Sequence, residues 1–283
     1  MAEQELGAPW AGARDAVSAL APASPGPWRA RLRRAALGLA LPAALLLLAE
    51  LAVRAGWLGS HWLPAPSEVG RTLLWLARND LAGHVLASSL RVLAGFAIGA
   101  VLALLAGTLV GLSPLAAALL TPSFQALRAI PSLAWVPLLL LWLGIDEAPK
   151  LALIAIGAFF PVYMGVASGL HDVDRKLVEV AHQRGFHGAA LARHVLLPAA
   201  MPAVLTGLRN GLSLAWMFMV AAELIAASQG LGYLLTDGRE TGRADIVLAA
   251  IVVLALLGKF SDGLMAALER HLLRWRHTFG GAE

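Results

Sequence analysis

The sequence contains no cysteine and has few charged residues. The absence of cysteine excludes disulfide bonds, zinc sites built on thiolates and catalysis by a thiol. Charged residues make up 14% of the chain, whereas residues of this kind average about 25% in soluble domains. Hydrophobic residues reach 59% and the mean hydropathy is +0.72. This composition, with its long apolar runs, indicates an integral membrane protein.

Motifs for nucleotide binding and hydrolysis are also missing. The segment LLGKFS has the Gly-Lys pair of a P-loop, but it lacks the earlier glycine and carries Phe260 in place of Ser or Thr. Neither HExxH nor GxSxG occurs. The histidines between residues 171 and 199 form no i, i+4 pair of a helical metal site; they are His171, His182, His187 and His194. We therefore expect no metal, no cofactor and no catalytic residue.

The excess of basic over acidic residues has two interpretations. The sequence pI is about 10.1, which would suit a protein that binds nucleic acid. Few acidic residues and arginine clusters beside apolar segments give the same value in membrane proteins. We expect membrane lipid, and no nucleic acid, as the surroundings of this charge.

Six apolar segments are long enough to cross a bilayer, because a helix needs about 20 residues to span a core of about 30 Å. The third contains Pro122 and Pro131 and is too long for one straight helix, so we interpret it as a single broken span. The first apolar run is longer than the region of about 7–15 residues in a signal peptide, which favours an uncleaved span. The predicted spans are 35–54, 90–112, 115–144, 150–170, 200–227 and 246–267.

The distribution of basic residues predicts an orientation. With both termini placed in the cytoplasm, twelve Lys and Arg residues lie on the inner side and seven on the outer side. The chain then has a flexible cytoplasmic tail (1–34), a transmembrane domain (35–270) with a cytoplasmic loop (171–199), and a C-terminal cytoplasmic tail (271–283). On the outer side, the segment 55–89 predicts a short amphipathic helix with Ser67 as its N-cap.

Pairs of glycines recur at a spacing of four residues. They are Gly95 and Gly99, Gly107 and Gly111, and Gly207 and Gly211. Small residues at this spacing let two membrane helices approach closely. The pairs predict tight helix packing and carry no information on function.

One stretch of the inner loop, EVAHQRGFHGAALARHVLLP (179–198), keeps polar and small residues together between two apolar segments. The sequence predicts a short amphipathic helix over 173–186 that ends at Gly185, and a second short helix over 187–197 that leads to Pro198. Two short helices joined at a glycine would form a stiff projection that suits docking to a partner. An ordinary loop beside the membrane is the alternative. The apolar face of the first helix comprises Val173, Leu177, Val180 and Ala181.

The spacing Glu-x-Ala-x3-Gly-x9-Val-x-Leu-Pro in this stretch resembles the EAA loop of binding-protein-dependent ABC importer permeases. Val180 stands where the usual pattern has a second Ala, and Val195 stands in place of Ile. Over residues 60–270, segments such as LRAIPSLAWVPLLLLWLGIDEAPK and AAELIAASQGLGYLL resemble the aliphatic sulfonate branch. The matching motif residues are Glu179, Ala181, Gly185, Val195, Leu197 and Pro198.

The resemblance implies an all-α transmembrane domain of a type I ABC importer, in the cytoplasmic (inner) membrane of a bacterium. Its partners would be a second permease copy in a homodimer, two cytoplasmic ATP-binding subunits, and a periplasmic or extracellular substrate-binding protein. Residues 173–186 would dock in a groove of the ATPase. An aliphatic sulfonate is the expected substrate, and taurine, nitrate or a thiamine precursor remains open. A self-contained secondary transporter, with inverted repeats and mid-membrane carboxylates, and an intramembrane enzyme are the other classes.

Polar residues inside the predicted spans are candidates for the translocation path. A charge near the bilayer centre costs at least about 2.5–3.5 kcal/mol, so such a residue faces protein or water rather than lipid. Arg128, just before the Pro131 break, would favour an anionic substrate. Structural pairing with a helix end or a carboxylate is the alternative for each charged residue. The candidates are Arg128, Pro131, Ser132, Trp135, Arg209 and Glu223.

Overall fold

The structure is a computed structural model that describes residues 27–57, 59 and 63–274. It divides into two units, residues 1–58 and 59–283, which we describe separately. The described residues form helices and no strand, as the sequence predicted. Most of the two predicted tails, residues 1–26 and 275–283, lies outside the described residues.

The first unit contains one helix, α2 (Pro27–Arg54), in its described part. It begins at Pro27 rather than at residue 35, so the end of the predicted tail is helical. Its apolar part, Leu37–Arg54, is long enough to cross a bilayer and coincides with the first predicted span. Near its end, the guanidinium of Arg54 pairs with the carboxylate of Glu50 at 2.7 Å, one helical turn away.

Four long helices of the second unit correspond, in the same order, to four of the predicted spans. They are α4 (Leu81–Leu112), α7 (Glu147–His171), α10 (Leu197–Ala226) and α12 (Ala244–Leu272). The main difference is at α4, which begins at Leu81 rather than at residue 90. With α2, the described residues have five helices of sufficient length and apolarity, or six if a bent helix pair counts as one span.

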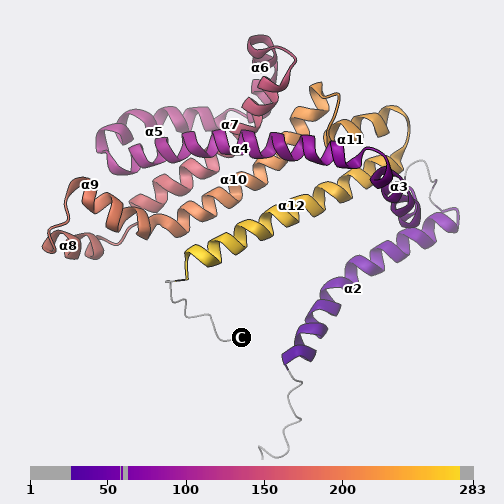
Figure 1. Cartoon of the computed structure of the whole chain (residues 1–283), viewed down its shortest axis with the longest axis horizontal. Helices are drawn as coiled ribbons and strands as arrows, with labels where there is room; N and C mark the ends of the chain where they lie inside the picture. The colour runs from indigo at the N-terminus through magenta and orange to yellow at the C-terminus, as the bar shows by residue number, and fades with distance from the viewer. Residues whose placement is uncertain (1–26, 58, 60–62, 275–283) are drawn as a thin grey trace, which may run out of the picture. The chain divides into compact units, whose positions relative to one another are not determined.

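Helix α7 packs along both α4 and α10 and forms the centre of the second unit (Figure 1). The glycine pairs permit this packing. A Cβ atom on Gly207 would lie 3.1 Å from the Cα of Gly165, and one on Gly107 would lie 2.7 Å from the Cβ of Val166. In lipid, where apolar surface gains little from leaving the solvent, such close contact is a main source of helix association. The predicted close approach is confirmed.

The bent pair lies where the sequence predicted a broken span. Helix α5 (Pro114–Ala129) is followed by a 3-10 turn, η1 (Ser132–Trp135), and by α6 (Val136–Leu143). The chain turns by 89° between the two halves. The break falls at Pro131, because Ile130 is held in an extended conformation before the proline (φ −77°, ψ 124°). Pro122 lies inside α5 without ending it.

Two short helices pack against the beginning of α12. They are α3 (Pro66–Arg78) and α11 (Leu231–Glu240), and their buried side chains form an apolar cluster that includes Leu76, Leu231 and Ile246. The predicted N-cap of α3 is wrong: Ala65 is the N-cap, and no side chain caps the helix. Pro66 takes the first helical position, where its missing N–H needs no partner.

Candidate functional site

The first half of the motif stretch folds as predicted, into the short helix α8 (Arg175–Gln183). The Asp174 carboxylate accepts a hydrogen bond from the backbone N–H of Lys176 at 2.9 Å and caps the helix. At the other end, Gly185 has a φ of +84°, the left-handed conformation that ends a helix and favours glycine. Both ends of α8 are therefore fixed by local chemistry.

The apolar face of α8 is largely uncovered in the chain. Leu177 is 45% exposed and Val180 is 50% exposed, whereas Ala181 is buried. Beside this face, Glu179 forms an exposed ion pair with Arg175 at 3.4 Å. A short helix with capped ends and open apolar side chains has the form of a docking element.

The second half of the stretch differs from the predicted separate helix. A four-residue helix, α9 (Gly188–Leu191), passes through a π-helical turn, η2 (Ala192–Leu196), directly into α10. Val195 lies in the π turn, and Leu197 and Pro198 are the first residues of α10. The motif residues therefore lie on two elements: Glu179, Val180, Ala181 and Gly185 in and just after α8, and the rest at the base of a span.

Arg128, in the last turn of α5, lines a cavity of about 430 Å³ between α5 and α7. Thr121 and Gln125 line the same cavity from α5, and Tyr163 and Ser168 line it from α7. The recorded partner of the Arg128 guanidinium is the sulfur of Met164, a weak acceptor. No carboxylate within residues 27–57, 59 and 63–274 pairs with it. The positive charge of Arg128 is therefore not neutralised by the described part of the chain.

The break after α5 brings three more candidates near this cavity. Pro131 is exposed and precedes η1, which contains Ser132 and Trp135, both half-buried. Trp135 lines a second cavity of about 400 Å³, together with Phe124 and Phe160, which also line the Arg128 cavity. The structure thus gathers four of the candidate path residues around the break.

Arg209 lies apart from these residues, in an ion pair between α10 and α12. Its Nε and Nη2 donate to the two carboxylate oxygens of Asp262 at 2.5 and 2.9 Å. Glu269, two turns further along α12, is 3.8 Å away. This two-bond geometry is the strong form of an Arg–carboxylate pair. Pairing is therefore the visible role of Arg209.

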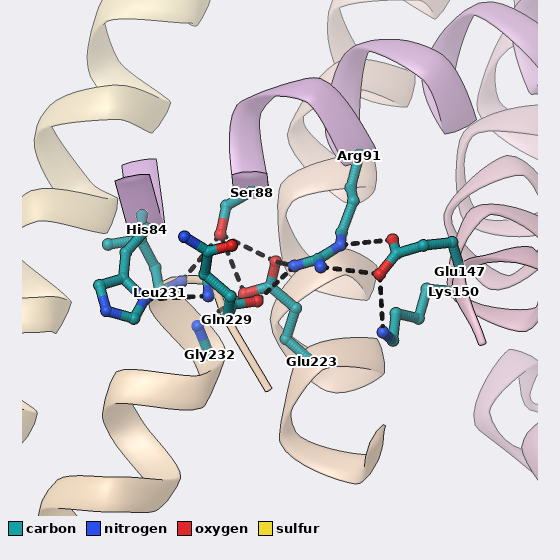
Figure 2. A network of polar contacts seen from close by, with 10 residues as sticks. His84, Ser88, Arg91, Glu147, Lys150, Glu223, Gln229, Leu231 and Gly232 are labelled. Carbon is teal, nitrogen blue, oxygen red and sulfur yellow. Dashed lines mark hydrogen bonds and ion pairs between the residues drawn. The ribbon is translucent and has the colours of Figure 1, made fainter. Parts of the chain in front are cut away.

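Glu223 lies in a buried polar network that joins α4, α7, α10 and the start of α11 (Figure 2). The residue is 1% exposed, and its carboxylate accepts hydrogen bonds from Ser88 Oγ at 2.8 Å, Arg91 Nη1 at 2.7 Å and the backbone N–H of Gly232 at 2.7 Å. Arg91 also donates twice to Glu147, at 2.7 and 2.8 Å. Burial of the carboxylate is tolerable because each of its oxygens has donors.

The loop before α11 is held by the same network (Figure 2). Ser88 Oγ accepts from the backbone N–H of Leu231 at 2.8 Å, and His84 Nδ1 accepts from that of Gly230 at 3.0 Å. These amides belong to the first turn of α11, where intrahelical partners are missing. Arg91 donates to the carbonyl oxygen of Gln229 at 2.6 Å. The network therefore caps α11 from α4.

Sequence reasoning missed most of this network, because it placed Arg91 at the edge of a span and His84 and Ser88 in a loop. A signal was available. His84, Ser88 and Arg91 follow the spacing i, i+4, i+7, which places polar side chains on one face of an apolar helix. In the part of the chain that the structure describes, no cluster of side chains could hold a metal ion.

Comparison with known proteins places the chain in a family. Residues 95–274 match the family described as "Binding-protein-dependent transport system inner membrane component". SsuC of Bacillus subtilis (strain 168), named for aliphatic sulfonates transport, is 40% identical over 86% of this chain and 89% of its own length. SsuC of Escherichia coli (strain K12) is 42% identical over 84% of this chain and 91% of its own length.

Two further proteins are similar over most of the chain. The taurine transport system permease protein TauC of Escherichia coli (strain K12) is 36% identical over 76% of this chain and 80% of its own length. A chain of the MetNI methionine ABC transporter in an inward-facing conformation has a TM-score of 0.61. It covers 71% of this chain and 98% of its own length at 19% identity, so it supports the fold alone.

These matches confirm the predicted permease and set aside the secondary transporter and the intramembrane enzyme. The relatives are named as permeases, which are the non-catalytic components of ABC transporters. The chain belongs to the family of binding-protein-dependent transport system inner membrane components and is a multi-pass permease of an ABC importer.

Proposed function

We propose that this permease imports aliphatic sulfonates. The proposal rests on the 40% and 42% identity of this chain to two permeases named for these substrates, over most of each protein. The permease named for taurine is less similar, at 36%. Taurine is itself a sulfonate with an added amino group, so both comparisons favour the same anionic headgroup. Nitrate and thiamine precursors are the remaining alternatives.

The coupling role belongs to α8. Its exposed Leu177 and Val180 supply an apolar surface, and Glu179 supplies a charge beside it. A cytoplasmic ATPase subunit with a matching groove would grip this helix, and the connection through α9 and η2 would transmit the motion to α10. Glu179, Val180, Ala181, Gly185, Val195, Leu197 and Pro198 are the proposed coupling residues.

The assembly has two copies of this permease, two ATPase subunits and a substrate-binding protein on the outer side. Family membership supports the ATPase and the substrate-binding protein as partners. A homodimer and cytoplasmic termini are our proposals, the second supported by the bias of Lys and Arg toward the loop 171–199 and the terminal segments.

The break between α5 and α6 is the proposed path for the anion. Arg128 supports this assignment because it faces a cavity and has no carboxylate partner among residues 27–57, 59 and 63–274. Pro131, Ser132 and Trp135 would line the path next to it. For Arg209 and Glu223, the ion pairs with Asp262 and Arg91 favour structural roles over the path role.

Uptake by a bacterial strain that produces the whole importer tests this function. The permease is expressed with its ATPase subunit and binding protein in a strain that lacks sulfonate importers, with an alkanesulfonate as the sole sulfur source. We expect ATP-dependent uptake of alkanesulfonates that nitrate does not inhibit. Uptake of nitrate or a thiamine precursor, without uptake of alkanesulfonates, would contradict the substrate assignment.

A further inference from the structure

Two cavities meet at an aromatic wall near the break between α5 and α6. One, of about 430 Å³, contains Arg128, and the other, of about 400 Å³, contains Trp135 and Trp142. Phe124 and Phe160 line both. Each volume falls in the range of about 300–1,000 Å³ that is typical of ligand pockets. The two cavities therefore form adjoining compartments.

The first compartment has polar side chains on the faces that α5 and α7 present to it. On α5, Thr121, Gln125 and Arg128 follow the spacing i, i+4, i+7 and lie on one side of the helix. Across the cavity, Ser168 on α7 donates its hydroxyl hydrogen to the carbonyl oxygen of Met164 at 2.6 Å. The guanidinium of Arg128 and the amide of Gln125 remain as donors for an anion, since the recorded partner of Arg128 is a thioether.

The second compartment is apolar throughout. Leu102, Leu139 and Ile156 line it with the two tryptophans, and no charged side chain borders it in the described part of the chain. The wall that separates it from the first compartment is stabilised by packing between aromatic rings. The ring of Phe124 lies 4.7 Å from that of Tyr163 and 5.6 Å from that of Phe159, in tilted contacts.

We propose that the permease itself holds an alkanesulfonate across both compartments, with the headgroup at Arg128 and the alkyl chain beside Trp135 and Trp142. This inference rests on the proposed function and adds that the permease, not only the binding protein, discriminates by chain length. A sulfonate spreads one charge over three oxygens, which a guanidinium meets with two parallel hydrogen bonds. Burial of the chain strengthens binding by roughly fourfold per methylene.

The apolar compartment adjoins the cavity of Arg128, whose charge has no carboxylate partner in the described part of the chain. This combination indicates which kind of molecule binds there. A lipid chain or a helix of a second copy would cover apolar surface, but neither accounts for a cation at the mouth of the same space. An anion with an alkyl tail matches both halves. Its hold must stay weak, because a tight site inside a path would trap the substrate.

A transport experiment tests chain-length discrimination in the full complex. Ile156→Phe narrows the apolar compartment and should lower the ratio of octanesulfonate to ethanesulfonate uptake about tenfold, the scale on which pockets reject misfitting apolar groups. Because every strain has the same binding protein, its own preference affects the uptake ratio equally in all of them. A difference in the ratio between variants therefore comes from the permease. Leu105→Phe adds the same bulk at an exposed position of α4 outside both cavities, and should leave the ratio unchanged. An unchanged ratio in Ile156→Phe, at normal assembly, would overturn the inference.

A binding experiment gives a readout that needs no transport. In the purified complex in nanodiscs, 8-bromooctanesulfonate should quench tryptophan fluorescence in a saturable manner, and Arg128→Gln should weaken this quenching. The double variant Trp135→Phe, Trp142→Phe should remove the quenching, whereas Trp75→Phe on α3 should retain it. Saturable, Arg128-dependent quenching supports the site even if the complex imports no sulfonate. If the complex imports sulfonates but shows no such quenching, the proposed site is wrong and the proposed function stands. The site is also wrong if a brominated phospholipid quenches equally and the sulfonate does not displace it.

Discussion

The carboxylate of Glu223 shows how one buried charge is made tolerable. Its donors are a hydroxyl and a guanidinium from α4 and a backbone amide from the first turn of α11. The fit is close, because any Cβ on Gly230 would collide with the carboxylate, and one on Gly232 would lie 2.5 Å from the Cβ of Glu223. Gly230 also has a φ of +136°, which a residue with a side chain rarely adopts.

We expect Glu223→Gln to destabilise the permease by about 3–5 kcal/mol, the cost of removing one partner from a buried ion pair. The new NH₂ group would face other donors, and Arg91 would lose one of its two carboxylates. Thermal denaturation of the purified complex measures the effect. Glu240→Gln is the matched control, since Glu240 is exposed at the end of α11 and should change stability by less than about 0.5 kcal/mol. Equal melting temperatures of the two variants would contradict the buried-pair interpretation.

The pair of Arg209 and Asp262 allows a test of pairing against a path role. Asp262→Asn should lower the amount of assembled complex, because Arg209 then retains only Glu269 at 3.8 Å. Exchanging the two residues, Arg209→Asp with Asp262→Arg, should restore part of the loss, so that the effects of the two single changes are not additive in a double-mutant cycle. Uptake per assembled complex should stay near that of the wild type. If the exchanged variant assembles well and yet transports nothing, Arg209 belongs to the path.

At the scale of elements, the helix ends and breaks that could be predicted are those set by residues close by in the sequence. The end of α8 was readable because Gly185 acts on its own helix terminus. The break at Pro131 was readable because proline constrains the residue before it. The start of α4 was not readable, because His84 and Ser88 reduce the apolar signal there. Their partners, Gly230 and Glu223, are distant along the chain, and no local pattern reveals such a contact.

The same limit applies to the candidate site. The sequence predicted that Arg128 and Pro131 lie together, because they are neighbours on the chain. It could not predict that α7 supplies the opposite wall of the cavity, with Tyr163 and Ser168, because the cavity exists only after the helices pack. The spacing of the motif predicted a short docking helix where α8 lies, but it did not reveal the π turn that joins α9 to α10.

Substitution of Gly185 should test whether the angle of α8 matters for coupling. A Cβ at Gly185 would meet open space, so any effect comes from its positive φ and not from a clash. Gly185→Asn should retain most coupling, since Asn tolerates the left-handed region, whereas Gly185→Val should lose most of it, at a strain of about 1–2 kcal/mol. The measurement is ATPase stimulation by loaded binding protein. Ala189→Val, on exposed α9, controls for added bulk and should behave as wild type. Equal stimulation in the Asn and Val variants would show that the angle is unimportant.

At the scale of the whole second unit, the long helix α10 fixes which elements lie on opposite sides of the membrane. Its 30 residues rise about 45 Å at about 1.5 Å each, which exceeds a hydrocarbon core of about 30 Å. Helix α8 precedes its start and α11 follows its end, at opposite ends of the unit (Figure 1). The buried network therefore lies toward the side of α11, far from the motif residues of α8.

The orientation of the second unit decides whether α8 or α11 faces the cytoplasm. The loop that contains α8 carries four basic residues, Arg175, Lys176, Arg184 and Arg193, whereas the segment of α11 carries two, Arg239 and Arg243. Because the chain has no cysteine, single cysteines can be introduced without background. In intact cells, Glu240→Cys should react with a membrane-impermeant thiol reagent and Gln183→Cys should not, since both positions are exposed and only the barrier differs. Both should react after the membrane is made permeable. If Gln183→Cys reacts in intact cells instead, α8 lies outside, where no ATPase subunit could grip it, and the proposed coupling role is wrong.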